Sequence, residues 1–120
     1  MLRTLLIMGL AAVPALAAAA PPPGWKVYAD CAAGYHANSQ LKDPSRPSGM
    51  AAMISDQAGD YQKAALKAYT ADPANAKHSR SYGETFVSTY VERRSPAYSK
   101  LSRDDLDRFL DTCPQLEVPG

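Results

Sequence analysis

The sequence predicts an all-α fold: a small four-helix up-down bundle stapled by one disulfide between the first helix and the fourth. Three observations lead to this prediction. Four segments carry apolar residues at helical spacing, and the stretches between them (KDPSRPS, TADPANAKH and SPAYSK) are rich in turn-forming residues. The only two cysteines, Cys31 and Cys113, fall in the first and the last of the four segments.

The first predicted helix spans residues 24–41, where an apolar stripe recurs at i, i+3, i+4 and i+7; it consists of Tyr28, Cys31, Ala32 and Tyr35. The second, over residues 49–69, has the clearest pattern, with charged residues kept away from one apolar face. This face should point towards the core. It consists of Met50, Met53, Ile54, Ala58, Tyr61, Ala65 and Ala68.

The third predicted helix covers residues 81–95. Its β-branched residues would also suit a strand, but Ser81 and Glu84 have the spacing of a capping box, which favours a helix. We expect it to end before the stretch SPAYSK. Its inner stripe should consist of Tyr82, Phe86 and Tyr90, with Val87 and Val91 alongside.

The fourth predicted helix covers residues 101–113. Ser102 is a favourable N-cap residue, and acidic residues follow it in the first turn, where the helix dipole favours negative charge. Pro114 should end the helix. The predicted buried stripe consists of Leu106, Phe109, Leu110 and Cys113.

The topology predicts a Cys31–Cys113 disulfide. Short loops make neighbouring helices antiparallel, so the start of the first helix and the end of the fourth lie at the same end of the bundle. A catalytic thiol would leave the second cysteine unexplained. A metal site would require His36 and His78 to converge on the cysteines without the short ligand spacing of metal motifs, so no metal is expected.

The N-terminus has the layout of a secretory signal peptide: Arg3, an apolar stretch of nine residues, and A-x-A cleavage motifs. Nine helical residues cover only about 13 Å, less than a bilayer core of roughly 30 Å. The protein should therefore be exported to the periplasm or the extracellular space, without stable membrane insertion after cleavage. The expected organisation is a cleaved signal peptide (1–19), a Pro-rich leader (20–24), a single helical domain (25–116) and a tail (117–120).

The charge is balanced. The chain has 13 basic and 12 acidic residues, and loss of Arg3 with the signal peptide would make the two numbers equal. A nucleic-acid partner would call for a basic excess, so none is expected. No haem-attachment motif C-x-x-C-H occurs, and no cofactor is expected.

The chain has seven tyrosines, several of which fall on predicted inner stripes where phenylalanine would be simpler. A buried hydroxyl needs a hydrogen-bond partner, so these groups either reach the rim of a small domain or line a shallow groove that binds a peptide or a small molecule. Methionines pack adaptably and could line such a groove too. Its candidate residues are Tyr28, Tyr35, Met50, Met53, Tyr61, Tyr82 and Tyr90.

The signal peptide, size, helix content and cysteine count resemble those of small exported helical proteins of proteobacteria with one disulfide, a group that includes acid-stress chaperones and immunity-type proteins. Unlike in those chaperones, the cysteines here lie near the two ends. The expected function is that of a non-enzymatic binding protein: an inhibitor, an immunity factor or a stress chaperone. The alternative is a small periplasmic hydrolase, for which Asp30 and His36 are the nearby acid and base candidates.

Overall fold

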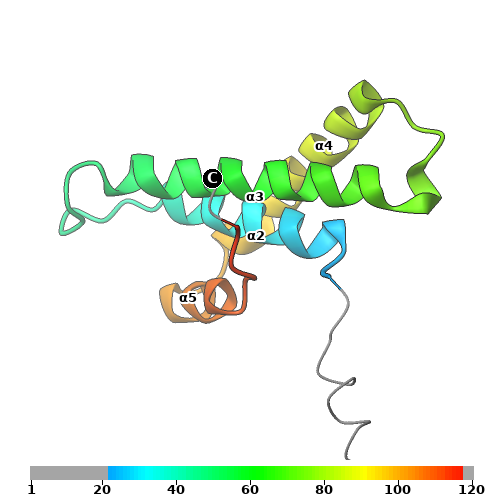
Figure 1. The fold of residues 1–120 in the computed structure, drawn as a ribbon. Coiled ribbons are helices and arrows are strands. Elements are labelled where there is room, and N and C mark those ends of the chain that lie inside the picture. Colours follow the sequence, from blue (N-terminus) through cyan, green and yellow to red (C-terminus); the bar gives the residue numbers. More distant parts are fainter. Residues whose placement is uncertain (1–21, 118–120) are drawn as a thin grey trace, which may run out of the picture.

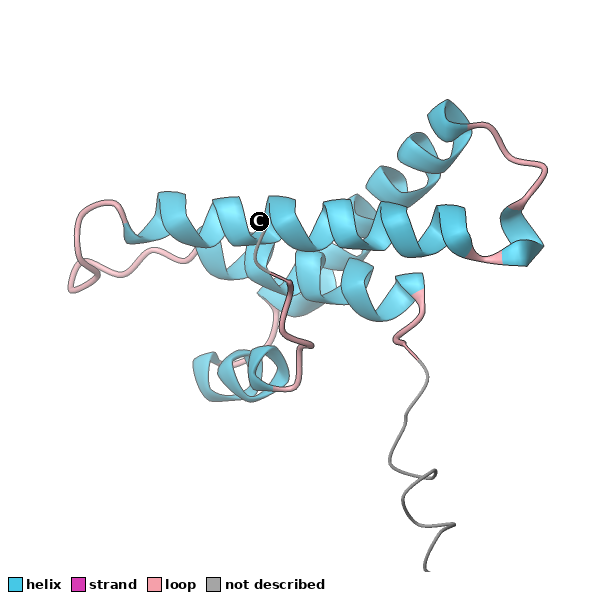
Figure 2. Cartoon of the chain, viewed as in Figure 1, coloured by secondary structure: helices cyan, strands magenta, loops and turns pink. Residues whose placement is uncertain are grey.

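The computed structural model describes residues 22–117. Four α-helices make up this part of the chain, together with one short 3₁₀ turn and no strands (Figure 2). The predicted signal peptide (1–19), the start of the leader and the end of the tail lie outside the described residues. The elements are α2 (Trp25–Ser39), α3 (Met50–Ala71), η1 (Pro73–Asn75), α4 (Arg80–Ser99) and α5 (Arg103–Asp111).

Helices α2 and α3 form an antiparallel pair, α4 crosses them obliquely, and the short α5 packs on α2 (Figure 1). The all-α, four-helix prediction is therefore confirmed. Within the described residues, no helix combines the length and the apolar character that a membrane crossing requires.

Helix α2 lies at the centre of the fold. Its predicted stripe is buried at Cys31 and Ala32, but Ala29, Ala33 and Ala37 on other sides of the helix are buried as well. The reason is that α3, α4 and α5 all contact α2. Small side chains on several faces allow these close approaches, so α2 lacks the single apolar face of a surface helix.

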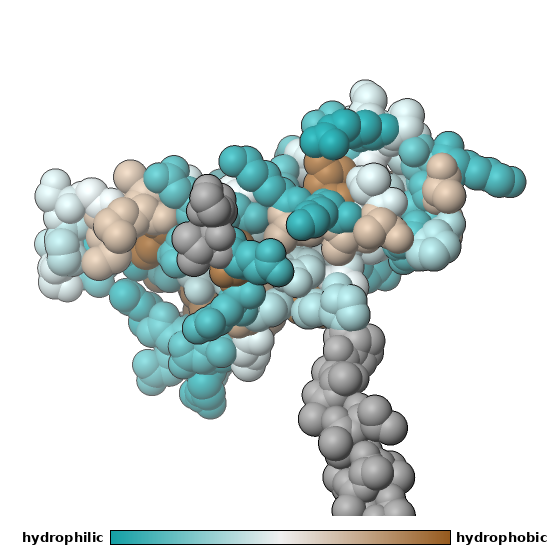
Figure 3. Space-filling view, in the orientation of Figure 1, coloured by the Kyte–Doolittle hydropathy of each residue, from teal (hydrophilic) through white to brown (hydrophobic). Residues whose placement is uncertain are grey.

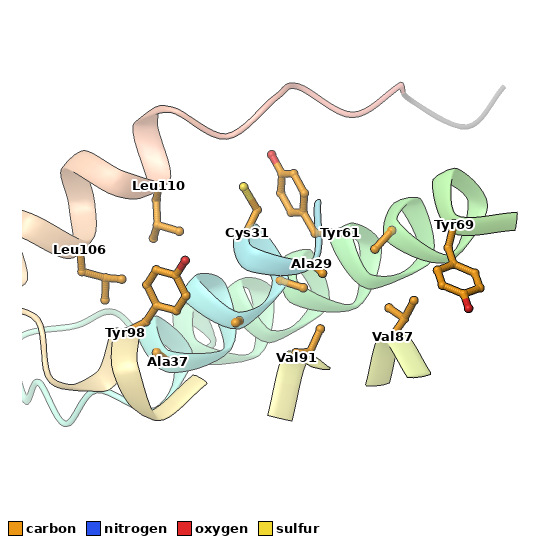
Figure 4. Packing of buried hydrophobic residues seen from close by; sticks show 13 residues of the cluster. Ala29, Cys31, Ala37, Tyr61, Tyr69, Val87, Val91, Tyr98, Leu106 and Leu110 are labelled. Atoms are coloured by element: carbon orange, nitrogen blue, oxygen red, sulfur yellow. The ribbon is translucent and has the colours of Figure 1, made fainter. Parts of the chain in front are cut away.

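The core combines these alanines with tyrosines and a few aliphatic side chains (Figure 4). Leu106 and Val87 are its largest fully buried side chains. On α3, the buried residues are Ile54, Ala58, Tyr61, Ala65 and Tyr69, whereas Met53, predicted to face the core, is 65% exposed. The predicted stripe is thus correct along the middle of α3 and wrong at its first turn.

Helix α4 differs from its prediction at both ends. It begins after Ser79, whose hydroxyl accepts a hydrogen bond from the Tyr82 N–H, so the capping box at Ser81 is not the helix start. It continues through Pro96 to Ser99, although the sequence predicts a loop over the stretch SPAYSK. A proline removes one helical hydrogen bond, but continuation packs the buried Tyr98 ring against Phe109, with 4.6 Å between ring centroids.

The buried face of α4 is also rotated from the predicted one. Gly83, Val87, Val91, Ser95 and Tyr98 are buried. Tyr82 and Phe86, predicted to point inward, are 49% and 43% exposed. An added Cβ at Gly83 would lie 3.2 Å from the Tyr69 ring, so the glycine allows α4 to cross close to α3.

The last helix has the predicted N-cap and the predicted buried leucines. The Ser102 hydroxyl caps α5 by accepting a hydrogen bond from the Asp105 N–H, and Leu106 and Leu110 are buried. Cys113 lies just beyond the last turn of α5 and forms the predicted disulfide with Cys31, 82 positions earlier, with 6.0 Å between the two Cα atoms. The bond ties the last helical region to the central helix.

Two helical glycines provide a matched test of this packing. A Cβ at Gly34 would lie 2.8 Å from the Phe109 ring, whereas a Cβ at Gly59 has no neighbour within 4 Å. Gly34→Ala should lower the free energy of unfolding by about 1–2 kcal/mol, because overpacking outweighs the gain in helix propensity. Gly59→Ala should raise it by up to about 1 kcal/mol. Urea denaturation checks both, and equal effects would contradict the α2–α5 contact.

Candidate binding surface

Six aromatic rings gather where α2 begins, α3 ends and α4 begins. Trp25, the only tryptophan of the chain, lies at the centre. Its ring meets three neighbours edge-on, with centroid distances of 5.6 Å to Tyr69, 5.5 Å to Phe86 and 5.0 Å to Tyr90. Such edge-to-face contacts add to the stabilisation from area burial. We call this cluster the aromatic surface; it consists of Trp25, Tyr69, His78, Tyr82, Phe86 and Tyr90.

The outer part of the aromatic surface faces solvent. Tyr82 and Phe86, one turn apart on α4, stack with 6.0 Å between centroids and are about half exposed. The His78 ring lies 4.3 Å from the Tyr82 ring and is hydrogen-bonded through Nδ1 to the buried Tyr69 hydroxyl. The Phe86 ring also packs against the buried Tyr69 ring, with 5.5 Å between centroids. The exposed rings therefore contact one another, and both Phe86 and His78 connect them to Tyr69.

A polar network joins the aromatic surface to the middle of α4. Asp30 of α2 accepts hydrogen bonds from the Tyr90 hydroxyl (3.1 Å) and from Arg94 Nε (3.0 Å). The Arg94 guanidinium also lies over the Tyr98 ring, 5.5 Å from its centroid. The hydrogen bonds to Tyr98 and to Asp30 raise the pKa of Arg94. This network fixes α4 against α2 and so holds Tyr90 in place.

The seven residues of the predicted groove lie at three separate places. Tyr82 and Tyr90 belong to the aromatic surface. Tyr35 and Tyr61 stack face to face, with 5.2 Å between ring centroids, and Tyr61 bonds to Pro114 next to the disulfide. Tyr28 is half-buried on the same helix as Tyr35. The methionines lie in the first turn of α3; they are Met50, half-buried, and Met53, exposed.

Tyr61 illustrates how the tyrosine hydroxyls are satisfied. Its hydroxyl donates to the Pro114 carbonyl oxygen at 2.6 Å, so it ties α3 to the segment that follows the disulfide. Tyr90 donates to Asp30 and Tyr69 pairs with His78, as described above. These hydroxyls explain why tyrosine rather than phenylalanine occupies inner positions: each one connects two elements of the fold.

Sequence reasoning did not place Trp25, Tyr69 or His78 in a site. The spacing of Tyr82, Phe86 and Tyr90 at i, i+4 and i+8 does indicate an aromatic face on α4, which the sequence predicts to point inward, with Tyr82 and Tyr90 as candidates for the groove. The partners come from the start of α2, the end of α3 and the loop before α4, which no local pattern connects.

The two hydrolase candidates do not share a site. Asp30 is held in the network with Tyr90 and Arg94, whereas the His36 side chain is exposed further along α2. Their spacing of six residues places them about 120° apart around the helix. In the part of the chain that the structure describes, no three His, Cys, Asp or Glu side chains come together as metal ligands would.

Two adjoining hollows follow the line where α3 meets α4. The first is lined by Gly59, Gln62, Lys63, Leu66, Glu84, Thr85, Val87 and Ser88, and the second by Lys63, Leu66, Lys67, Thr70, Ala71 and Arg80. In this region Figure 3 shows hydrophobic surface between hydrophilic side chains. None of the seven predicted groove residues lines either hollow.

The tyrosines predict how stability depends on alkaline pH. Burial is the main cause that raises the pKa of Tyr61, Tyr69, Tyr90 and Tyr98 above the ordinary 10.0. A raised folded-state pKa contributes stability that is present below the unfolded pKa of about 10 and is lost as pH rises through the folded values. Unfolding should therefore accompany phenolate formation above about pH 10.

Ultraviolet phenolate absorbance and circular dichroism recorded on the same samples check this prediction. We expect part of the phenolate absorbance to appear only together with the loss of helix content. Titration of all seven tyrosines near pH 10 with unchanged helix content would contradict the burial of these hydroxyls.

Comparison of the chain with protein-family models, with curated proteins and with solved structures found no match.

Proposed function

We propose that this protein is an exported, non-enzymatic binding protein of the periplasm or extracellular space, and that it binds a partner polypeptide through the aromatic surface. One observation carries the proposal: Tyr82 and Phe86 are adjacent and about half exposed, and the Phe86 ring packs against Trp25. The inhibitor, immunity and stress-chaperone roles all require such a protein-binding surface.

Aromatic side chains supply large contact areas at low cost in conformational entropy, and they are enriched at the energetic centres of protein interfaces. Here the rings are already ordered by contacts with one another. Tyr82, which is about half exposed, also carries a hydroxyl that can form a hydrogen bond. A partner would thus gain apolar contact without having to order these side chains.

Two further features support an exported protein without catalytic function. A disulfide such as Cys31–Cys113 persists in oxidising compartments, which include the periplasm and the extracellular space. The Asp30 carboxylate is engaged by Arg94 and Tyr90, so it is occupied in holding α4 against α2.

The test is capture of partners from a periplasmic extract by the immobilised protein, quantified by mass spectrometry. Tyr82→Ala and Phe86→Ala should each reduce capture of the specific partner about tenfold or more, as expected for residues at the centre of an interface. Met53→Ala is the matched control, because Met53 is an exposed apolar residue in the first turn of α3, whereas the aromatic surface lies where α3 ends.

Circular dichroism and the thermal midpoint of each variant establish that the fold is retained. Equal capture by the wild type and by both aromatic variants would overturn the proposal. Loss of capture with Met53→Ala alone would place the binding site at the start of α3 instead.

A further inference from the structure

The two hollows between α3 and α4 adjoin, because Lys63 and Leu66 line both of them, and we call the pair the groove. Their volumes are about 570 and 410 Å³. Along α3 the groove runs from Gly59 to Ala71, roughly 18 Å at the helical rise. This length corresponds to between three and four turns of a helix laid beside α3.

The floor of the groove is apolar, and part of its α4 side consists of small side chains. The floor consists of Val87, which is buried, and Leu66, which is half-buried. Thr85 and Ser88 of α4 line the groove with short side chains. Gly59 leaves open space where a side chain would otherwise stand. Helix α5, the fourth helix of the described chain, packs on α2 and does not cover this face.

The rim of the groove is mainly cationic. Lys63 and Lys67 stand one turn apart on α3, and Arg80 faces the same hollow from α4, against the single acidic residue Glu84. Arg80 and Glu84 pair at 3.9 Å with both side chains more than half exposed, so this pair is weak. Salt bridges among the described residues involve arginines and none of the lysines.

We infer that this groove binds an amphipathic helix of a partner polypeptide that carries acidic residues beside its apolar face. An apolar channel between two helices is the shape that accepts a third helix. The cations at Lys63, Lys67 and Arg80 select carboxylates on the occupant, since like charges one turn apart on α3 disfavour each other until they are neutralised.

This groove is distinct from the aromatic surface. On α4, Arg80, Glu84 and Ser88 face the groove, whereas Phe86 and its neighbours lie on the aromatic surface. At 100° per residue, positions 84 and 86 point about 160° apart around the helix. Loss of binding at one surface therefore does not require loss at the other, and the two proposals can fail separately.

The probe is a synthetic helical peptide of about 14 residues, with leucines at i, i+3, i+4 and i+7 and glutamates at the flanking positions. A control peptide carries lysine in place of each glutamate. Fluorescence anisotropy with the full chain should show binding of the acidic peptide that weakens as salt is added. Equal affinity for the basic peptide, or binding of neither peptide, would overturn the inference.

Variants locate the binding. Lys63→Glu combined with Lys67→Glu should weaken acidic-peptide binding about tenfold, as loss and reversal of two exposed charges predict. Lys42→Glu combined with Arg93→Glu changes the net charge equally but does not touch the groove. Equal weakening by both pairs would mean that net charge alone attracts the peptide and would overturn the site.

Gly59→Trp tests the groove by shape. The added ring should fill it without disturbing the fold, because a Cβ at this position has no neighbour within 4 Å. We expect peptide binding to be lost while the thermal midpoint stays the same or rises. Retained binding would contradict the inference. Sedimentation that reveals a dimer dissolved by Gly59→Trp would also contradict it, because the occupant would then be a second copy of the chain.

Discussion

Reduction of the Cys31–Cys113 disulfide should lower the free energy of unfolding by about 2–5 kcal/mol. The bond closes a loop between positions 82 residues apart, which restricts the unfolded chain. It also retains α5, a helix of nine residues that is too short to be stable alone. Since α2, α3 and α4 pack on one another, most helix content should survive reduction.

Urea denaturation with and without reductant measures the change, and hydrogen exchange locates it. Protection should be lost mainly over residues 103–113. The double variant Cys31→Ala, Cys113→Ala is the control, since its stability should be low and independent of reductant. An unchanged urea midpoint on reduction of the wild type would show that α5 is held by packing alone.

Leu106→Ala should lower the free energy of unfolding by about 2–5 kcal/mol, the range for large-to-small substitutions in a core. Leu106 is only 1% exposed and is one of the two largest fully buried side chains. It anchors α5 to the core close to Leu110, Tyr98 and Ala37 (Figure 4). Its removal leaves a cavity that the short helix can close only by shifting.

Leu101→Ala provides the matched control for this second prediction. Leu101 lies just before α5 and is 39% exposed, so its truncation should change stability by about 0.5 kcal/mol or less. Equal losses of stability for Leu101→Ala and Leu106→Ala would contradict the packing of α5 on the core through Leu106. Chemical denaturation of the disulfide-bonded form keeps the two measurements comparable.

Apolar spacing in the sequence predicts the four helices and the disulfide because both follow from local periodicity and short connections. The residue type of Ser102 predicts the cap of α5, which is a purely local interaction. Prediction from the sequence fails where a contact with another segment decides the outcome. Helix α4 continues through Pro96 because Tyr98 gains a buried contact with Phe109, from a segment that follows it in the chain.

Packing partners also decide which residues of α4 form the candidate site. The inward orientation predicted for Tyr82 and Phe86 is wrong because α4 turns its smaller residues, Gly83 and Val87, towards the other helices. Close crossing favours these small residues, so the bulky aromatic rings remain at the surface. Helical period alone identifies a stripe of apolar residues, but it cannot say which of two adjacent stripes faces the core.

Fluorine NMR of protein labelled with fluorotryptophan tests the central claim most directly, because Trp25 is the only tryptophan and lies at the centre of the aromatic surface. The partner isolated by capture is added to the labelled protein. We predict that the single resonance shifts or broadens as the partner binds, and that it does not respond in the Phe86→Ala variant. An unchanged resonance while sedimentation confirms complex formation would contradict binding at this surface.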